Sequence, residues 1–470
     1  MIINKYRKMS NTVKASMWYA VGNFFQKGLS MLLLPIYTRV MTSAEYGQYS
    51  LYQSWFSIIS IFATLNLSYY VFNNGMIKYP YHRNEFISSL WGLSSLTTLI
   101  IGALGLIFKE QWIAMTGLSE KFWILIIVES LVTPAYLYWS AKERFDYKYK
   151  GILLVTIITS VMIPIVSLIL MKQITAHGLA AVVGRVAVIV IVYIFPLGFI
   201  LSHSRQIVNI DYWKYALNFN LPLIPHFLSA IVLAQADRIM IGKMFGESEV
   251  GIYSIAYSIS FAISILNSSI LNTFVPWTYR KMQKKNYEDI NRNSIKLLIM
   301  IASIGFGVML LAPEIICVVA PPEYHNAIYA MPPIICSVYF MFLFNLFANI
   351  EYYYEKTKFV MIASCMSAFL NIILNYIVMP RYGYLAAGYT TLVCYIVYSL
   401  NHYLFMEYIC KKQKISIYNK YSILKISGIV LVLMFVSVIL YNVMLLRYFF
   451  LVVGSVIIFK KFLPNYKKHI

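Results

Sequence analysis

Long apolar segments follow one another along most of this 470-residue chain, and each is long enough to cross a lipid bilayer as a helix. A spanning helix needs about 20 mainly apolar residues, and only short connections remain between these segments. Charged residues make up 12% of the chain, whereas a soluble domain carries about 25%. The pattern therefore predicts an all-α, polytopic membrane protein and argues against a soluble enzyme.

About fourteen transmembrane helices are expected. They lie at residues 15–38, 49–72, 86–108, 112–139, 152–171, 177–201, 215–242, 250–276, 294–320, 328–350, 359–379, 384–409, 423–442 and 445–463. No connection is long enough to form a separate domain, and the sequence contains no GxxxxGK[ST] motif for binding a nucleotide. ATP-driven transport by this chain alone is therefore not expected.

The basic residues are distributed unevenly between the two sides of the predicted bundle. Of 39 Lys and Arg residues, 29 fall on the side that holds both termini, seven on the other side and three within the spans. Because cytoplasmic loops carry an excess of Lys and Arg, both termini are predicted to be cytoplasmic. We interpret the net charge of +21 as a topology signal with contacts to anionic lipid headgroups, and we expect no nucleic-acid partner.

The remaining composition indicates no cofactor. The five cysteines lie in or at the ends of apolar segments, and none forms a CxxC or a metal-binding spacing. We therefore expect neither a disulfide framework nor a metal site. The N-terminal segment lacks a small-residue cleavage site after a short apolar core, so a cleaved signal peptide is not expected.

A short motif recurs at the same place in two parts of the chain. Residues 45–50 read EYGQYS and residues 249–254 read EVGIYS, at an offset of 204. The tripeptide Leu-Ala-Ala recurs at residues 179–181 and 385–387, at an offset of 206. Two matches at similar offsets indicate an internal repeat of about 205 residues.

The repeat predicts three parts: a six-helix half at residues 1–204, a second six-helix half at 205–415, and two additional helices at 416–470. Because six is even, the two halves run in the same sense and are related by an axis along the membrane normal. In transporters, two such bundles enclose a central cavity, and rocking one against the other exposes it to each side in turn.

Polar side chains recur at helical spacing in several predicted helices. The rows include Asn23 in the first span, Ser57 in the second and Tyr257 in the eighth. Spacings of three and four place each row on one helix face. Such rows form hydrogen bonds between helices or line a hydrated cavity. Their recurrence in both halves favours the cavity, so these three residues are candidates for substrate binding.

Three basic residues lie within the predicted spans. Lys27 is about 12 residues, or roughly 18 Å, into the first span, where a lysine is costly unless it faces water or a partner. We interpret it as a cavity cation that meets an anionic substrate, with a structural ion pair as the alternative. Arg185 either contacts substrate or reaches the interface by snorkelling. Arg238 either contacts substrate or forms a gating or packing salt bridge.

The candidates for ion coupling or gating are acidic residues and one histidine. Glu129 lies in the fourth span and Asp237 near the outer end of the seventh, and they are the best candidates for an ion or proton site. His226 follows two prolines in the seventh span. It marks either a bent helix with freed carbonyl groups or a hydrogen-bonded packing residue.

Two segments carry a family resemblance. Residues 34–47, LPIYTRVMTSAEYG, resemble the segment that closes the first helix of bacterial polysaccharide flippases of the Wzx type. Residues 237–242, DRIMIG, running on to residues 250–254, VGIYS, resemble the same proteins at helix seven. These flippases belong to the superfamily that also contains multidrug (MATE-type) exporters and the lipid II flippase.

The resemblance implies a MATE-like fold and transfer of an undecaprenyl-pyrophosphate-linked oligosaccharide between leaflets of the bacterial cytoplasmic (inner) membrane. O-antigen or capsule synthesis would use the translocated unit. By this resemblance Lys27, Arg185 and Arg238 would contact the anionic head while the prenyl tail stays in lipid. Alternating access with H⁺ or Na⁺ counter-transport is a further family expectation, with a polysaccharide polymerase and chain-length proteins as partners.

Two other functions compete with this one. A MATE-like multidrug/ion antiporter would need acidic residues facing a largely apolar cavity, and carboxylates are scarce in the predicted spans. A membrane polysaccharide polymerase would normally place catalytic residues on a long outer loop, and the sequence has none. We therefore expect a transporter and not an enzyme.

Overall fold

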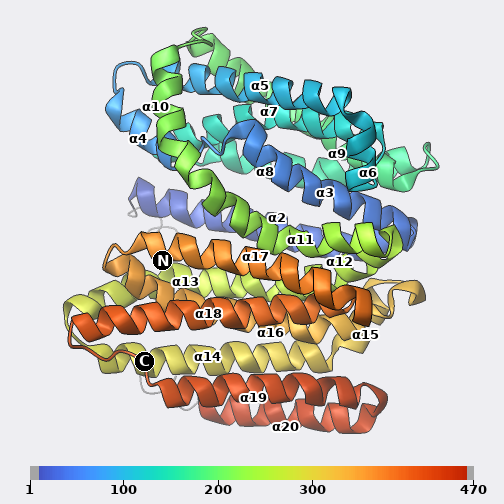
Figure 1. Cartoon of the computed structure of the whole chain (residues 1–470), viewed down its shortest axis with the longest axis vertical. Helices are drawn as coiled ribbons and strands as arrows, with labels where there is room; N and C mark the ends of the chain where they lie inside the picture. Colours follow the sequence, from blue (N-terminus) through green and yellow to red (C-terminus); the bar gives the residue numbers. More distant parts are fainter. Residues whose placement is uncertain (1–9, 463–470) are drawn as a thin grey trace, which may run out of the picture. The chain divides into compact units, whose positions relative to one another are not determined.

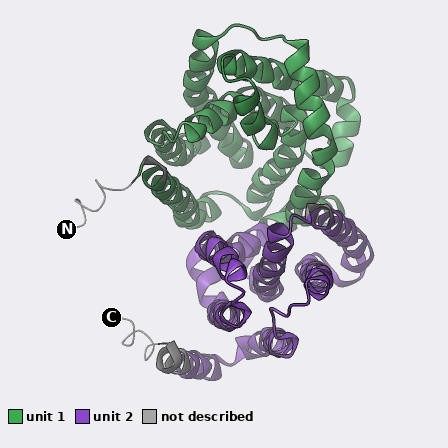
Figure 2. Cartoon of the chain, turned by 90° about the vertical axis from the view of Figure 1, so that its left-hand side faces the viewer, with its two compact units in different colours: residues 1–251 green, residues 252–470 purple. Residues whose placement is uncertain are grey.

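The computed structural model describes residues 10–462, and this range contains helices and no β-strand. The chain divides into two compact units, residues 1–251 and 252–470 (Figure 2). The boundaries after residues 204 and 415, which rest on the sequence repeat, stay predictions. Each unit has its own helical core.

The first unit is built from ten helices, one 3-10 turn and the beginning of α12 (Figure 1). They are α2 (Asn11–Val40), α3 (Ser43–Thr64), α4 (Tyr70–Lys78), α5 (Arg83–Ile107), α6 (Lys109–Thr116), α7 (Glu120–Phe145), α8 (Lys150–Met171), α9 (His177–His203), α10 (Ile210–Asn220), η1 (Leu221–Leu223), α11 (Ile224–Met244) and α12 (Glu247–Phe261).

The second unit continues from α12 through eight further helices, and Figure 1 shows α19 and α20 running side by side at its edge. Its elements are α13 (Ile263–Gln283), α14 (Tyr287–Leu310), α15 (Ala312–Val319), η2 (Pro322–Tyr324), α16 (Ala327–Tyr353), α17 (Thr357–Tyr382), α18 (Ala386–Lys412), α19 (Lys420–Ile439), η3 (Leu440–Asn442) and α20 (Met444–Phe462).

The helices coincide with the expected spans. Within the described range, ten helical segments are long and apolar enough to cross a membrane, and α2, α3 and α18 have similar lengths. Each expected span matches one helix or two consecutive ones. The second span, for example, comprises α3 and α4, which are separated where Leu65 and Asn66 take positive φ angles of 49° and 52°. The prediction of an all-α polytopic protein is confirmed.

The core of the first unit lies among α4, α5, α7, α9 and α10. It is formed by aromatic and aliphatic side chains that are almost fully buried, including Phe72, Phe86 and Tyr138. Phe72 stacks on Tyr138 with their ring centroids 6.0 Å apart. The Tyr138 hydroxyl lies 2.5 Å from Ser94 Oγ, so α7 is also joined to α5 by a hydrogen bond. Such a bond satisfies a polar group that could find no water inside a bilayer.

The core of the second unit is organised around α16. Almost every residue of this helix is buried, because α16 is apolar on all sides and its neighbours α13, α14, α18 and α19 cover it. Tyr339 on α16 lies 3.1 Å from Ser427 Oγ on α19. At the edge of the unit, Arg447 on α20 forms an ion pair with Glu314 on α15, with an N–O distance of 2.7 Å.

The repeated sequence motif has a structural role at the start of α3. Thr42 and Glu45 form a capping box, in which the Thr42 side chain accepts a hydrogen bond from the Glu45 amide and the Glu45 carboxylate accepts one from the Thr42 amide. The same carboxylate accepts a hydrogen bond of 2.8 Å from the His177 amide. The glutamate of the motif therefore ties the beginning of α3 to the beginning of α9.

Within the first unit, the glycines of the two motif copies lie where α3 meets the beginning of α12. A Cβ atom on Gly47 would lie 1.8 Å from the Glu247 carbonyl oxygen. One on Gly251 would lie 2.0 Å from the Ser43 carbonyl oxygen. Each glycine thus faces the carbonyl group four residues before the other glycine. This reciprocal backbone contact explains why both copies of the motif contain glycine.

Side chains reinforce this contact. Ser43 Oγ lies 2.7 Å from Ser248 Oγ, and Gln48 donates a hydrogen bond of 2.8 Å to the Glu247 carboxylate. We call residues 43–48 and 247–251 the paired helix ends. They hold two helix beginnings together with one backbone contact in each direction and two polar side-chain contacts.

Replacement of Gly47 tests this contact. We expect Gly47→Leu to lower the thermal unfolding temperature of the purified protein, because overpacking of a closed contact costs about 1–3 kcal/mol or more. Gly198→Leu on α9 is the matched control, since no atom lies within 4 Å of a Cβ there. An unchanged melting temperature for Gly47→Leu, measured by intrinsic fluorescence in detergent, would contradict the arrangement.

Candidate functional site

A buried carboxylate, a guanidinium and a phenol meet where α3, α7 and α9 pack together. Glu129 on α7 is 1% exposed. Arg185 on α9 donates to it from Nη2 at 2.8 Å and from Nε at 3.1 Å. Tyr52 on α3 donates its hydroxyl hydrogen to the other carboxylate oxygen at 2.7 Å. The carboxylate is therefore neutralised by one partner and hydrogen-bonded by two.

Arg185 keeps part of its surface available despite this ion pair. Its side chain is 26% exposed, whereas that of Glu129 is 1% exposed. The guanidinium also lies over the Phe56 ring, 6.0 Å from its centroid. Two turns further along α7 from Glu129, Tyr136 stacks on Tyr193 of α9 with centroids 4.6 Å apart. The first unit thus combines an oriented guanidinium with aromatic rings from α3, α7 and α9.

A second polar cluster connects α3 with α11. Ser54 on α3 donates to Gln235 Oε1 at 3.0 Å, and Arg238 Nη1 donates to the same oxygen at 2.8 Å. Arg238 Nη1 also donates to the Ala234 carbonyl oxygen at 3.1 Å. Arg238 and Asp237 are buried, with 8% and 1% of their surfaces exposed. Arg238 therefore contributes to packing between two helices of the unit.

Lys27 differs from these basic residues because it is exposed and makes no hydrogen bond or ion pair with any side chain that the structure describes. It lies about 24 Å along α2 from Asn11 at about 1.5 Å per residue, which is near the middle of the helix. Asn23, one turn earlier, is also exposed. The structural ion pair considered for Lys27 is thus not formed by the described residues.

The helical period shows which way Lys27 faces. Residues seven apart lie on nearly the same face of a helix, so Lys27 shares a face with Leu34, which is 7% exposed because the end of α2 packs against its neighbours. Around Lys27 itself, the side chains of Asn23, Phe24 and Met31 are exposed. Lys27 therefore lies on an open part of α2.

The other predicted residues are placed as follows. Ser57 is partly buried on α3 and donates to the Gln53 carbonyl oxygen at 2.7 Å. His226, near the start of α11, is half-buried and lies beside the Phe227 ring, with the ring centroids 5.8 Å apart. Tyr257 lies in the second unit, where it is buried and stacks on Phe261 with centroids 4.9 Å apart.

Among the predicted residues, the structure brings Glu129 and Arg185 together. The sequence interpretation had assigned them separate roles, ion coupling for Glu129 and substrate contact for Arg185. Tyr52 was missed because it lies on a different face of α3 from the serine row. The pair Glu351 and His402 in the second unit was also missed. His402 lies well inside an expected span, and the rarity of ionisable residues in spans was a signal that could have identified it.

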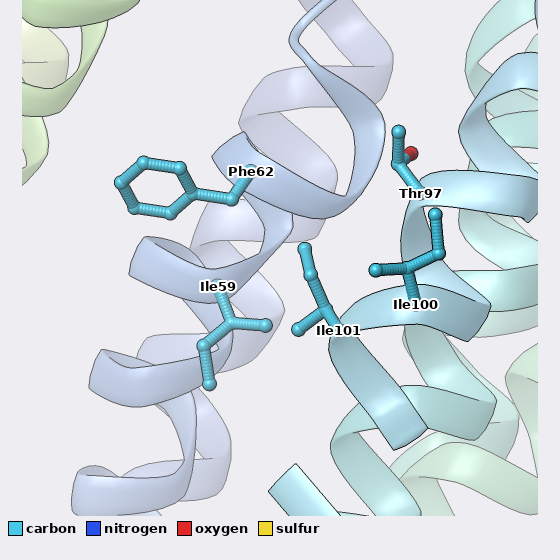
Figure 3. Close-up of a pocket in the computed structure, with 5 residues that line it drawn as sticks. All are labelled: Ile59, Phe62, Thr97, Ile100 and Ile101. Atoms are coloured by element: carbon cyan, nitrogen blue, oxygen red, sulfur yellow. The ribbon is translucent and has the colours of Figure 1, made fainter. Parts of the chain in front are cut away.

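An apolar groove lies apart from these charged groups, between α3 and α5. It has a volume of about 420 Å³ and is lined by Ile59, Phe62, Thr97, Ile100 and Ile101 (Figure 3). The Thr97 hydroxyl donates a hydrogen bond of 2.5 Å to the Ala63 carbonyl oxygen. The groove therefore suits hydrocarbon and offers no group for a charged or sugar-like ligand. No cluster of three or more metal-ligating side chains occurs in the described range.

Comparison with relatives in sequence gives two family matches. Residues 12–282 match the family described as polysaccharide biosynthesis protein, and residues 222–377 match the MatE family. Lsg locus putative protein 1 of Haemophilus influenzae is 21% identical over 370 residues, covering 76% of this chain and 89% of that protein. An uncharacterized membrane protein of the same organism is 24% identical over 319 residues, covering 64% and 74%.

Comparison with solved structures gives the fold. The lipid II flippase MurJ in an inward closed conformation matches with a TM-score of 0.70 at 16% identity, covering 95% of this chain and 99% of MurJ. An inward-facing multidrug resistance MATE family transporter of the MOP superfamily matches with a TM-score of 0.64 at 13% identity, covering 85% and 99%. Since the polysaccharide biosynthesis match covers more than half of the chain, this protein belongs to the polysaccharide biosynthesis protein family, with the fold of MOP-superfamily membrane transporters.

Proposed function

We propose that this protein moves an undecaprenyl-pyrophosphate-linked oligosaccharide from the cytoplasmic to the outer leaflet of the bacterial inner membrane. The translocated unit would serve the synthesis of O-antigen, capsule or a related surface polysaccharide. The observation that carries the proposal is Lys27, an unpaired cation near the middle of a long helix in a member of the polysaccharide biosynthesis protein family.

An unpaired lysine at this depth favours an anionic substrate. A charged side chain near the centre of a bilayer is costly unless it faces water or a partner, and Lys27 is exposed on an open part of α2. A pyrophosphate carries negative charge and strong hydrogen-bond acceptors, so it would bind an ammonium group there. The isoprenoid tail would remain in the hydrocarbon of the membrane.

Arg185 has a different part in this proposal. Glu129 already neutralises its charge, so Arg185 adds little net attraction for an anion. The ion pair instead holds the guanidinium in one orientation beside Phe56. A fixed guanidinium next to aromatic rings suits sugar hydroxyl groups and ring faces. We therefore assign electrostatic attraction to Lys27 and orientation of the head group to Arg185.

The carboxylates argue against export of cationic drugs. Such an exporter would need acidic groups that are open to the substrate. Glu129 is bound to Arg185 and Tyr52, and Glu351 is bound to His402. These two carboxylates are thus occupied within the protein and Asp237 on α11 is 1% exposed, whereas the open charge on α2 is positive.

The paired helix ends fit a gate in an alternating-access cycle. With both termini cytoplasmic, the ends of α3 and α12 at residues 43–48 and 247–251 lie on the outer side. Their contact rests on two glycines and a few hydrogen bonds, so it can separate without exposing a large apolar surface. We propose that these ends separate when the head group leaves towards the outside.

Deletion of the gene tests the proposed substrate class. We expect lipid-linked oligosaccharides to accumulate on the cytoplasmic face of the membrane while surface polysaccharide is lost. The measurement is mass spectrometry of extracted polyprenyl-linked sugars, together with their accessibility to a membrane-impermeant glycosidase. Unaltered lipid-linked pools would refute the proposal and favour the multidrug antiporter.

Substitution of Lys27 tests its role as the substrate cation. We expect Lys27→Ala to reach the membrane at normal abundance but to abolish surface polysaccharide, because the anionic head loses its partner. Lys27→Arg should retain part of the output, since the charge remains. Lys172→Ala, at an exposed lysine after α8, is the control and should behave as the wild type. Normal polymer output from Lys27→Ala would rule out the assigned role.

A reversible cross-link tests the gate. In a background with the five native cysteines changed to Ala, Ser43→Cys with Ser248→Cys should form a disulfide. Oxidation should stop transport, and reduction should restore it. The control pair is Ser88→Cys with Ser204→Cys, whose hydroxyl groups lie 3.1 Å apart within the same unit. Unimpaired transport with the first pair fully cross-linked would show that these ends need not separate.

A further inference from the structure

A fully buried acid–base pair lies in the second unit and has no part in the function proposed above. Glu351 on α16 and His402 on α18 have side chains that are 0% and 1% exposed. His402 Nδ1 lies 2.9 Å from one carboxylate oxygen of Glu351 and 3.0 Å from the other. The pair thus joins the two helices that form the centre of this unit.

Aromatic rings enclose His402 on two sides. Phe344 stacks on the imidazole with centroids 5.5 Å apart, and Tyr398 meets it edge-on at 4.8 Å. These rings cover two sides of the imidazole. A net charge left at this position would therefore be poorly solvated.

The neighbouring titratable groups do not compensate such a charge. Tyr398 on α18 interacts electrostatically with Glu351 and also with Tyr352 on α16 and Cys365 on α17, and these tyrosine and cysteine side chains are ordinarily neutral. In the described range, no Lys or Arg forms an ion pair with Glu351.

Proton counting limits the states of the pair. With one transferable proton, the pair is either an imidazolium with a carboxylate or a neutral imidazole with a carboxylic acid, and its net charge is zero. Loss of that proton leaves a net charge of −1. Since burial penalises an unpaired charge, the enclosed pair keeps its proton and releases it only when water gains access.

A route for water adjoins the pair. An open groove of about 310 Å³ between α17 and α18 is lined by Glu351, His402, Asn401, Phe359 and Met366, among others. His402 Nε2 and Asn401 Nδ2 are buried nitrogen atoms without a hydrogen-bond partner. In both neutral states of the pair, His402 Nε2 carries a hydrogen atom. This N–H group lies on the side of the ring away from Glu351 and has no hydrogen-bond acceptor. A water molecule is the partner that such a donor requires.

We propose that Glu351 and His402 form a proton-carrying site, which takes up one proton from water and returns one proton to water in each transport cycle. The pair gains a proton from hydronium on one side of the membrane and returns it to water on the other side, so no other reactant is needed. This inference rests on the proposed function, because it makes the transport of the lipid-linked oligosaccharide dependent on the proton gradient.

Direct titration tests the site without any substrate. The chain contains 7 histidines, and ¹⁵N-histidine labelling of the protein in lipid nanodiscs gives separate ring signals. We expect one pair of signals, absent from His402→Asn, to respond to the pH of the sample and to shift in Glu351→Gln. A His402 signal that does not respond to pH would overturn the proposal, and this result needs only the wild-type fold.

Proton flux tests the coupling. Proteoliposomes loaded with pyranine would contain lipids extracted from the deletion strain, in which the lipid-linked sugars accumulate. We expect sugar translocation by the wild type to be accompanied by lumenal acidification when the outside is acidic. Glu351→Gln and His402→Asn should lower both rates about tenfold. The control is Glu407→Gln on the same helix, whose side chain is 39% exposed, and it should leave both rates unchanged.

The outcomes separate the two proposals. Absence of sugar translocation by the wild type would refute the proposed function, whereas His402 titration would still be measured independently. Translocation without proton movement, or normal coupling in folded Glu351→Gln protein, would refute the proton site and leave the flippase function standing. The His402→Asn variant provides the second test if Glu351→Gln fails to fold.

Discussion

Absence of water from the interior of a bilayer is the constraint on which the arrangement of charges in this protein depends. An ionised side chain there needs a partner of opposite charge or access to water. Glu129 meets this requirement with Arg185 and Tyr52, and Glu351 is hydrogen-bonded to His402. Lys27 has no such partner among the side chains that the structure describes. Its charge therefore requires an aqueous opening or a ligand, and this requirement underlies the functional proposal.

The two acid–base pairs join helices that the sequence repeat predicts to be equivalent, but they lie at different heights along those helices. By the sequence repeat, α7 and α9 of the first half correspond to α16 and α18 of the second. Glu129 lies in the third turn of α7, whereas Glu351 lies two residues before the end of α16. The first pair presents a partly exposed guanidinium, while the second is fully enclosed. We infer that duplication supplied one scaffold and that its two copies took on different tasks, head-group orientation in one and proton exchange in the other.

Much of the fold could be predicted because the bilayer restricts what a chain can form. Every backbone polar group must be satisfied within the spanning segment, so long apolar stretches become helices. The repeated motif also predicted a structural landmark, and its glutamate and glycine do cap and closely pack the start of α3. The break between α3 and α4 at Leu65 and Asn66 was not predicted, because a single Asn, although it tolerates a positive φ angle, is a weak turn signal within an apolar run.

The sequence could predict candidate residues of the site but not which of them contact one another. All nine predicted residues are ionisable or lie in polar rows, and helical spacing could place each of them on a helix face. Which residues meet across helices depends on the rotation and height of each helix, and neither is encoded by local periodicity. Tyr52 therefore joined Glu129 without any sequence signal, and Glu129 and Arg185 became partners although 56 residues separate them.

The sequence by itself determined that this chain is a membrane protein of many helices, that its basic residues favour one side, and that a cation lies deep in the first helix. These properties follow from composition and local spacing, because the cost of burying polar groups in a bilayer depends directly on both. Only the tertiary structure decided which charges are neutralised and which remains open. Pairing depends on contacts between helices distant in the chain, and these contacts paired Arg185 and His402 while leaving Lys27 available.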